Sequence, residues 1–241
     1  MEQIRTFLDE RLDFGACVYC GGRLKGATTN VDHVPTKGLL DEPYPPNLPT
    51  VKVHTVCNSQ FSADELFLVV LLGCVLAGTT DIGPETDPRT ANRLGSNPRL
   101  RGEIAAARQV AFAKPGDPQI WWSVDPQRVT PVFVKNARGH VLFELGDSVL
   151  GSQKGVRFGA IELMDERRRS EFEDVHAGTD LALLPEIGSR SFVRRATGVD
   201  LVDGWVVVQA GVYRYSVVDI GDEIRVRSVI REYLATEVAF G

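Results

Sequence analysis

Two pairs of metal-binding side chains constrain the fold of this chain more than any other feature of its sequence. Cys17-Val-Tyr-Cys20 is followed, after 33 intervening residues, by His54-Thr-Val-Cys57. Each pair places two ligands on one side of a tight turn, and two such pairs supply the four N and S donors of a tetrahedral structural zinc site. The sequence around them is rich in Gly, Pro and Asn, so a metal is expected to hold a segment that has little apolar surface. The alternative is that His54 and Cys57 are ordinary buried residues.

Composition indicates an ordinary globular chain. It has 241 residues, 43% of them hydrophobic, and a net charge of -5. Its longest apolar run, Leu66 to Ala77, is shorter than the ~20 residues that a membrane span needs, and its first residues do not resemble a signal peptide. Four cysteines are too few for a disulfide scaffold in a chain this long. We therefore expect a cytoplasmic protein with no membrane partner.

Hydrophobic spacing predicts helices, and runs of β-branched and aromatic residues predict strands. Ser62 and Glu65 are expected to form a capping box at the start of an apolar helix that is buried nearly all round. Residues 78–99 are rich in Gly, Pro, Asn and Thr, which predicts a long loop or linker. The expected helices are 1–13, 66–76, 100–113 and 162–175, and the expected strands lie within 129–145 and 205–240.

These elements predict an α+β protein in three parts. Residues 1–77 would form the metal-stapled unit with a leading and a following helix. Residues 78–119 would form a linker and a basic helical segment, and residues 120–241 a β-rich domain of unknown role. Cys74 lies in the apolar helix, where core packing is its expected role.

A second set of polar residues surrounds the two ligand pairs. Asp32-His33-Val34-Pro35 lies between them, Asn47 follows two prolines, and Asn58 comes directly after the second pair. The segments TTNVDHVPTKGLL, PPNLPTV and CNSQFSADE resemble the HNH (ββα-metal) nuclease family, and more closely a group of bacterial HNH proteins with a DHVP…NL…CN core. The resemblance covers about residues 14–68 and implies a zinc-stapled, treble-clef-like ββα-metal unit. His54 departs from the pattern, because a second cysteine pair is usual there, and it could instead serve the catalytic site.

The resemblance implies a metal-dependent endonuclease and assigns a role to each residue. His33 would be the general base that activates water, since a neutral imidazole can take a proton near pH 7. Asp32 and Asn58 would offer hard oxygen ligands to one Mg²⁺ or Mn²⁺ ion, which stabilises the phosphate and the leaving oxygen. Asn47 would tether the loop that orients His33. The zinc would hold the fold and take no part in the chemistry.

Each of these residues also has a structural interpretation. Asp32 and His33 before a proline could form a simple turn. Asn47 could be an ordinary loop residue, and Asn58 could be an ordinary residue at the start of a helix. The alternative function is a non-catalytic, zinc-stapled module that binds nucleic acid or protein. An enzyme that acts on RNA or on a modified base is a third possibility.

Charge is unevenly distributed for a protein that binds DNA. Residues 1–68 hold six Lys and Arg against nine Asp and Glu, whereas residues 89–114 hold six against one. Phosphate contacts from the second stretch would supply the attraction that the first one lacks. A homodimer is the expected state of a nuclease with one site that cuts duplexes. The predicted DNA contacts are Lys37, Arg93, Arg99 and Arg101.

Overall fold

A computed structural model describes residues 15–46, 48–114, 117–175, 185, 187 and 189–241 of the chain. The predicted helix 1–13 and the predicted site residue Asn47 lie outside the described residues. The described chain forms two compact units. Unit 1 takes in the described part of 1–60 together with 133–241, and unit 2 is 61–132. These bounds differ from those of the predicted domains, because residues before and after unit 2 fold together.

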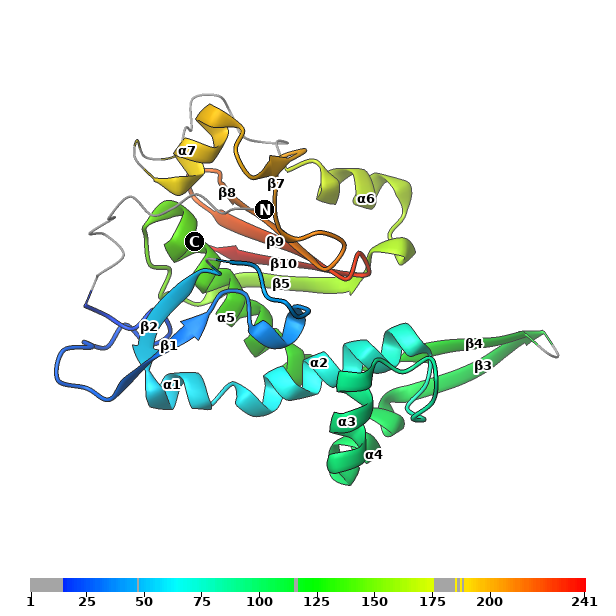
Figure 1. Cartoon of the computed structure of the whole chain (residues 1–241). Coiled ribbons are helices and arrows are strands. Elements are labelled where there is room, and N and C mark those ends of the chain that lie inside the picture. Colours follow the sequence, from blue (N-terminus) through cyan, green and yellow to red (C-terminus); the bar gives the residue numbers. More distant parts are fainter. Residues whose placement is uncertain (1–14, 47, 115–116, 176–184, 186, 188) are drawn as a thin grey trace. The chain divides into compact units, whose positions relative to one another are not determined.

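The N-terminal part of unit 1 is a small ββα arrangement (Figure 1). Strands β1 (Thr29–His33) and β2 (Thr50–His54) pair antiparallel, with Asp32 opposite Val51. A single 3-10 turn, Lys37–Leu39, lies between them, and helix α1 (Thr55–Ser59) follows β2 without a break and contacts both strands. This order of elements agrees with the ββα unit that the resemblance implies.

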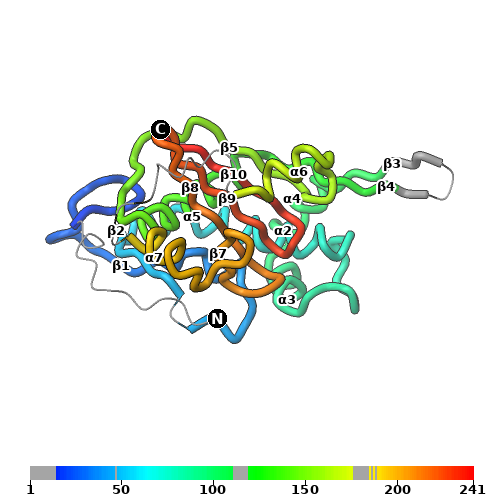
Figure 2. Tube along the Cα trace, turned by 90° about the horizontal axis from the view of Figure 1, so that it is seen from above, coloured from blue at the N-terminus to red at the C-terminus, as the bar shows by residue number. Residues whose placement is uncertain are grey.

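The C-terminal part of unit 1 is built on one antiparallel sheet of six strands, in the order β5-β10-β9-β8-β7-β6. The prediction of strands within 205–240 is confirmed, and Figure 2 shows β5, β10, β9 and β8 side by side. Turns that contain glycine or a residue with positive φ join the strands. The strands are β5 (Gln153–Ala160), β6 (Leu201–Val202), β7 (Trp205–Gln209), β8 (Tyr213–Asp219), β9 (Ile224–Ile230) and β10 (Leu234–Phe240).

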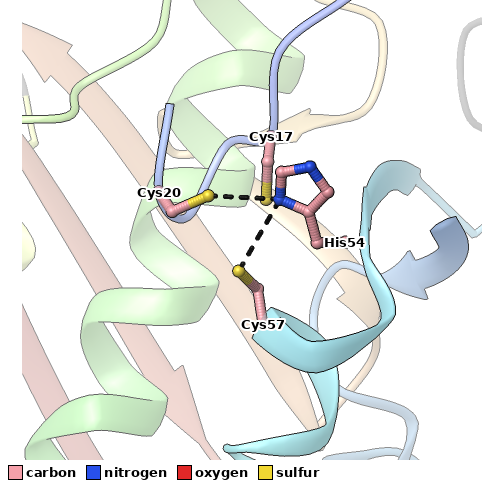
Figure 3. A group of neighbouring side chains, drawn as sticks. All are labelled: Cys17, Cys20, His54 and Cys57. Atoms are coloured by element: carbon pink, nitrogen blue, oxygen red, sulfur yellow. Dashed lines mark hydrogen bonds between the residues drawn. The ribbon is translucent and has the colours of Figure 1, made fainter. Parts of the chain in front are cut away.

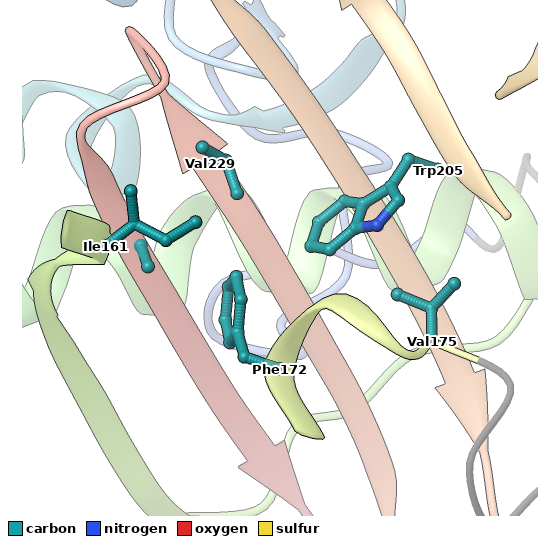
Figure 4. Close-up of a cluster of buried hydrophobic side chains, with 6 residues drawn as sticks. Ile161, Phe172, Val175, Trp205 and Val229 are labelled. Atoms are coloured by element: carbon teal, nitrogen blue, oxygen red, sulfur yellow. The ribbon is translucent and has the colours of Figure 1, made fainter. Parts of the chain in front are cut away.

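One face of this sheet is covered by α6 (Glu166–Glu173). Phe172 of α6 packs on Trp205 of β7, with ring centroids 5.7 Å apart, in an apolar cluster that includes Val229 (Figure 4). Arg214 of β8 points to the same face and forms a two-pronged ion pair with Glu173 at 2.8 and 3.0 Å. The short 3-10 helix Ile161–Leu163 precedes α6, so the predicted helix 162–175 is confirmed over its central part only.

Helix α5 (Pro126–Leu145) packs on the opposite face through a buried polar cluster. The ring of His140 stacks on Tyr215 at 3.7 Å, and its Nε2 lies 3.0 Å from the hydroxyl of Tyr213. Tyr215 donates to Glu144 of α5, and the other carboxylate oxygen of Glu144 accepts from Arg194 of α7 (Arg190–Thr197). Aromatic surface and paired charges thus join α5 and α7 to the sheet.

Unit 2 holds three helices, a two-stranded hairpin and the start of α5. Helix α2 (Ser62–Ala77) is followed by α3 (Pro88–Ser96), α4 (Pro98–Ala107), β3 (Arg108–Lys114) and β4 (Asp117–Trp122). Gly73 lets α2 and α3 approach closely, because an added Cβ would lie 2.2 Å from the hydroxyl oxygen of Thr90. Arg128 pairs with Asp64 and Glu103 and so ties the end of this unit to both α2 and α4.

Four predictions of secondary structure are wrong in detail. Residues 129–145 form α5 and not strands, because nearly all of 132–144 is buried and tertiary packing overrides β propensity. The expected loop 78–99 contains α3, which Asp87 caps and Pro88 begins. The expected helix 100–113 ends at Ala107, and β3 follows. Ser62 forms no capping box, because the preceding residues Gln60 and Phe61 are already helical.

One described helical stretch is apolar enough to cross a membrane by length and composition alone, Thr55–Ala77. A core helix of a folded domain meets the same test. Phe67, Leu68 and Cys74 are buried among neighbouring helices, and Asp64 near its start is ion-paired. The prediction of a packed Cys74 is therefore confirmed. The apolar helix is buried along one side but not nearly all round, since Leu76 is half exposed.

Candidate functional site

The two predicted ligand pairs form one cluster in unit 1 (Figure 3). Cys17 and Cys20 lie on a tight turn, which closes through a 2.8 Å hydrogen bond from the Gly21 N–H to the Cys17 carbonyl. His54 ends β2, and Cys57 lies one turn later in α1. The four potential ligand atoms all lie within 4.8 Å of one another. Tetrahedral zinc with Zn–S bonds of about 2.3 Å separates its sulfurs by about 3.8 Å, so this geometry fits zinc.

The orientation of His54 shows which nitrogen faces the thiols. Its Nε2 lies 3.1 Å from the carbonyl oxygen of Arg23, which can only accept, so Nε2 carries the proton and donates. The other ring nitrogen, Nδ1, lies 3.3 Å from Cys20 Sγ and 3.9 Å from Cys57 Sγ. A metal-binding histidine typically donates its second N–H in this way. Gly22 makes room for the ring, because a Cβ there would lie 2.9 Å from His54 Cε1.

The thiols differ in how readily they ionise. Burial opposes ionisation of Cys17, but backbone N–H groups of His54, Tyr19 and Cys20 outweigh it, so the pKa of Cys17 is lowered. Burial, together with the neighbouring thiols of Cys20 and Cys17, raises the pKa of Cys57 to about 12. A bound cation would stabilise several thiolates at once, as a structural metal does. The three thiols and one imidazole thus agree with a site for one metal ion.

The Asp32-His33 pair lies at the end of β1, beside the segment that leads into β2. The Val34 N–H donates to the Pro49 carbonyl at 2.8 Å, which holds the turn after His33 against that segment. Asn58 lies on α1, half-buried and next to Cys57. The ββα arrangement thus brings Asp32, His33 and Asn58 onto neighbouring elements. Lys37 follows on the 3-10 turn, and its side chain is exposed above the ring of Tyr44.

Asp32 is buried, with 8% of its surface exposed, and both of its carboxylate oxygens are engaged. Oδ1 accepts the backbone N–H of His33 at 2.9 Å, whereas Oδ2 accepts the hydroxyl of Tyr19 at 2.6 Å and pairs with the ammonium of Lys135 at 2.8 Å. A divalent ion needs lone pairs and negative charge that are not already neutralised. In this arrangement, the residues present do not fit a divalent ion held by Asp32.

His33 is half-buried at the end of β1. Burial lowers its pKa, and so do the positive charges of Lys37 and Lys135, whereas Asp32 opposes the shift. Because an ordinary imidazole is already largely neutral at pH 7, these effects hold His33 in the form that can accept a proton. Its electrostatic surroundings therefore suit a general base.

The predicted DNA-contacting arginines lie in unit 2, whereas His33 and Lys37 lie in unit 1. Arg93 is on α3 and is half-buried. Arg99 and Arg101 are on α4, where Arg99 is exposed and Arg101 pairs with exposed Asp81 at 3.1 Å. At least one of the three therefore presents its charge to solvent.

Two further residues belong to the site, Tyr19 and Lys135, and no sequence pattern identified them. Tyr19 lies inside the first ligand pair, and only its contact with Asp32 gives it significance. Lys135 lies in the apolar run VFVKNARGHVLF, where a lysine beside an asparagine is an unusual sign of buried polar side chains. That sign was present in the sequence, but it does not identify the partner of Lys135.

Comparison with protein-family models, with curated proteins and with solved structures finds no match for this chain. The likeness to HNH nucleases therefore rests on its motif residues and on the ββα order of β1, β2 and α1 alone.

Proposed function

We propose that this protein is an HNH-type endonuclease that hydrolyses phosphodiester bonds in DNA, with His33 as the general base. The observation that carries the proposal is the neutral, half-buried imidazole at the end of β1, in a ββα arrangement held by the cluster of Cys17, Cys20, His54 and Cys57. We propose further that the ion in this cluster is structural zinc, since three thiols and one imidazole are a common zinc ligand set.

In this proposal, His33 takes a proton from the water that attacks phosphorus, the bond from phosphorus to the departing 3′ oxygen breaks, and that oxygen takes up a proton from solvent. The exposed ammonium of Lys37 is near enough to affect the pKa of His33, so it can contact an oxygen of the same phosphate. The hydrogen bond from the backbone N–H of His33 to the carboxylate of Asp32 fixes the start of the turn. The family's Mg²⁺ or Mn²⁺ enters no step here, because the charge of Asp32 is paired with Lys135 and both of its oxygens already have partners.

The second candidate function is a non-catalytic, zinc-held module that binds DNA. One observation favours it, namely that the expected metal ligand Asp32 is engaged by Tyr19 and Lys135. The two candidates share the ββα arrangement and differ only in whether His33 takes part in chemistry.

A plasmid-nicking assay with zinc-loaded protein, run with and without Mg²⁺ and Mn²⁺, separates the two. His33→Ala is expected to lower the cleavage rate by about 10²–10⁴-fold, the usual effect of losing a general base. Val31→Ala is the matched control, because Val31 lies on the same strand and is 57% exposed. Cleavage that His33→Ala leaves unchanged would exclude His33 as the base, and a wild-type protein that binds DNA without cutting it would favour the module.

A further inference from the structure

Helix α5 is fitted closely to the turn that follows Asp32 and His33. The side-chain oxygen of Asn136 accepts both the backbone N–H and the hydroxyl of Thr36, at 3.1 and 3.2 Å. Gly139 lies against Val34, where an added Cβ would come within 2.5 Å of a methyl group. These contacts between α5 and the turn do not involve Lys135. The place of the Lys135 ammonium at Asp32 therefore follows from how the helix packs.

Lys135 itself is almost completely enclosed, with 1% of its side chain exposed. Its ammonium lies 2.8 Å from Asp32 Oδ2 and 3.3 Å from the hydroxyl oxygen of Thr36. An enclosed ammonium without a carboxylate is costly, and so is an enclosed carboxylate without a cation. Asp32, with Tyr19 as a second donor, is the group that compensates the charge of Lys135.

We infer that Lys135 occupies the cation position at Asp32, so that this carboxylate positions His33 and does not bind a divalent ion. The importance of this pair for cleavage rests on the proposed function, whereas the pair itself does not. Lys135 is a positioning residue: it neutralises Asp32, and Asp32 in turn accepts the backbone N–H of His33 at 2.9 Å. A fixed ammonium, unlike a bound ion, cannot be removed by a chelator.

Mn²⁺ binding to the zinc-loaded protein, followed by electron paramagnetic resonance, tests this inference without any assay of activity. Wild type is expected to bind no Mn²⁺ that depends on Asp32. Lys135→Met removes the competing ammonium and should bind Mn²⁺ at least about tenfold more tightly than the double variant Lys135→Met with Asp32→Asn, which lacks the carboxylate. Lys52→Met, at an exposed position on β2, is the matched control and should behave as wild type. Mn²⁺ binding in wild type that Asp32→Asn abolishes would overturn the inference, as would a Lys135→Met variant that gains none.

A thermal double-mutant cycle tests the ion pair independently. Lys135→Met and Asp32→Asn each leave one enclosed partner without its counterpart, so each should lower the melting temperature by roughly 6–20 °C. The double variant should lose clearly less than the sum of the two single losses, because neither charge is then left alone. Losses that simply add would show that the two side chains do not interact in solution. Either result leaves the proposal of nuclease activity to the nicking assay.

Discussion

His140 shows how an enclosed side chain acquires an unusual chemistry from its contacts. Its ring stacks on Tyr215 and lies beside Tyr213, and its Nδ1 has no hydrogen-bond partner among the residues described. Since the Tyr213 hydroxyl donates to Ser228, it accepts the Nε2–H of His140. Complete burial, together with the positive charge of Arg194, lowers the pKa of His140 to about 3. A second proton on the ring would have to bind Nδ1, and no described residue lies there to accept a hydrogen bond from it.

We predict that His140 makes the protein less stable in acid. The unfolded chain binds a proton at His140 below pH about 6.5, whereas the folded chain does so only near pH 3, so the free energy of unfolding falls as the pH falls between these values. The slope is about 1.4 kcal/mol per pH unit for one proton. His140→Phe keeps an aromatic ring against Tyr215 but cannot bind a proton. The slope of the free energy of unfolding against pH should therefore fall by the contribution of one proton, as measured by urea unfolding at several pH values. An identical slope in wild type and variant would contradict the buried, neutral histidine.

Among the elements, the turn around Cys17–Cys20 and the junction of β2 with α1 depend on each other for stability, because each supplies two of the four possible metal ligands. Within unit 1, the ββα part buries apolar side chains such as Val18, Leu39 and Val53, but it has only short elements: two strands and one helix of five residues each. Its two strands form a separate sheet that does not join the six-stranded one. A metal that joins the turn to the junction would therefore supply much of the local stability.

We predict that one zinc ion per chain accounts for this stability. Cys57→Ser should release one equivalent of zinc and lower the melting temperature, because the binding free energy of a structural zinc is part of the folding free energy. The matched control is Cys74→Ala, since Cys74 is also fully buried but lies on α2 outside the cluster. It should lose some packing energy and keep its zinc. Metal analysis with thermal unfolding checks both, and a wild type that melts normally after chelation would contradict the prediction.

For the whole molecule, the distribution of charge decides how DNA could be held. The net charge is -5, yet residues 89–114 carry six Lys and Arg against a single Glu. By contrast, two of the three arginines of α6 are paired locally, Arg167 with Glu171 and Arg168 with Asp165, and residues 165–173 hold four Asp and Glu against three Arg. Of these two stretches, residues 89–114 therefore have the excess of positive charge that phosphate contacts need.

We predict that replacing Arg93, Arg99 and Arg101 together by Ala weakens DNA binding and flattens its dependence on salt. Each lost phosphate contact lowers the slope of log affinity against log salt by about 0.9, so the total change is at most about 2.7. A His33→Ala background prevents cleavage during the titration. Replacing Arg167, Arg168 and Arg169 by Ala removes the same charge and should leave the slope nearly unchanged. Equal effects of the two triple variants would show that only net charge matters.

The sequence by itself determined the features that depend on short spacings. The two ligand pairs, each within one turn of chain, predicted the cluster of Cys17, Cys20, His54 and Cys57 that the structure contains. Runs of β-branched and aromatic residues, broken by Gly and Asp, predicted the strands of 205–240, because such side chains pack well on a pleated sheet. The order β1, β2, α1 also agrees with the motif residues around Asp32 and His33.

Only the tertiary structure decided what lies around those residues. The segment 129–145 has enough β-branched residues for a strand, and it becomes helix α5 because it is enclosed between the sheet and the turn after His33. Thr36 and Asn136, the contact beside the Asp32–Lys135 pair, are 100 residues apart in the chain. Such a pair is set by the packing of a helix on a distant turn, and no local pattern encodes it. The sequence therefore suggested a free metal ligand at Asp32, where packing placed a lysine.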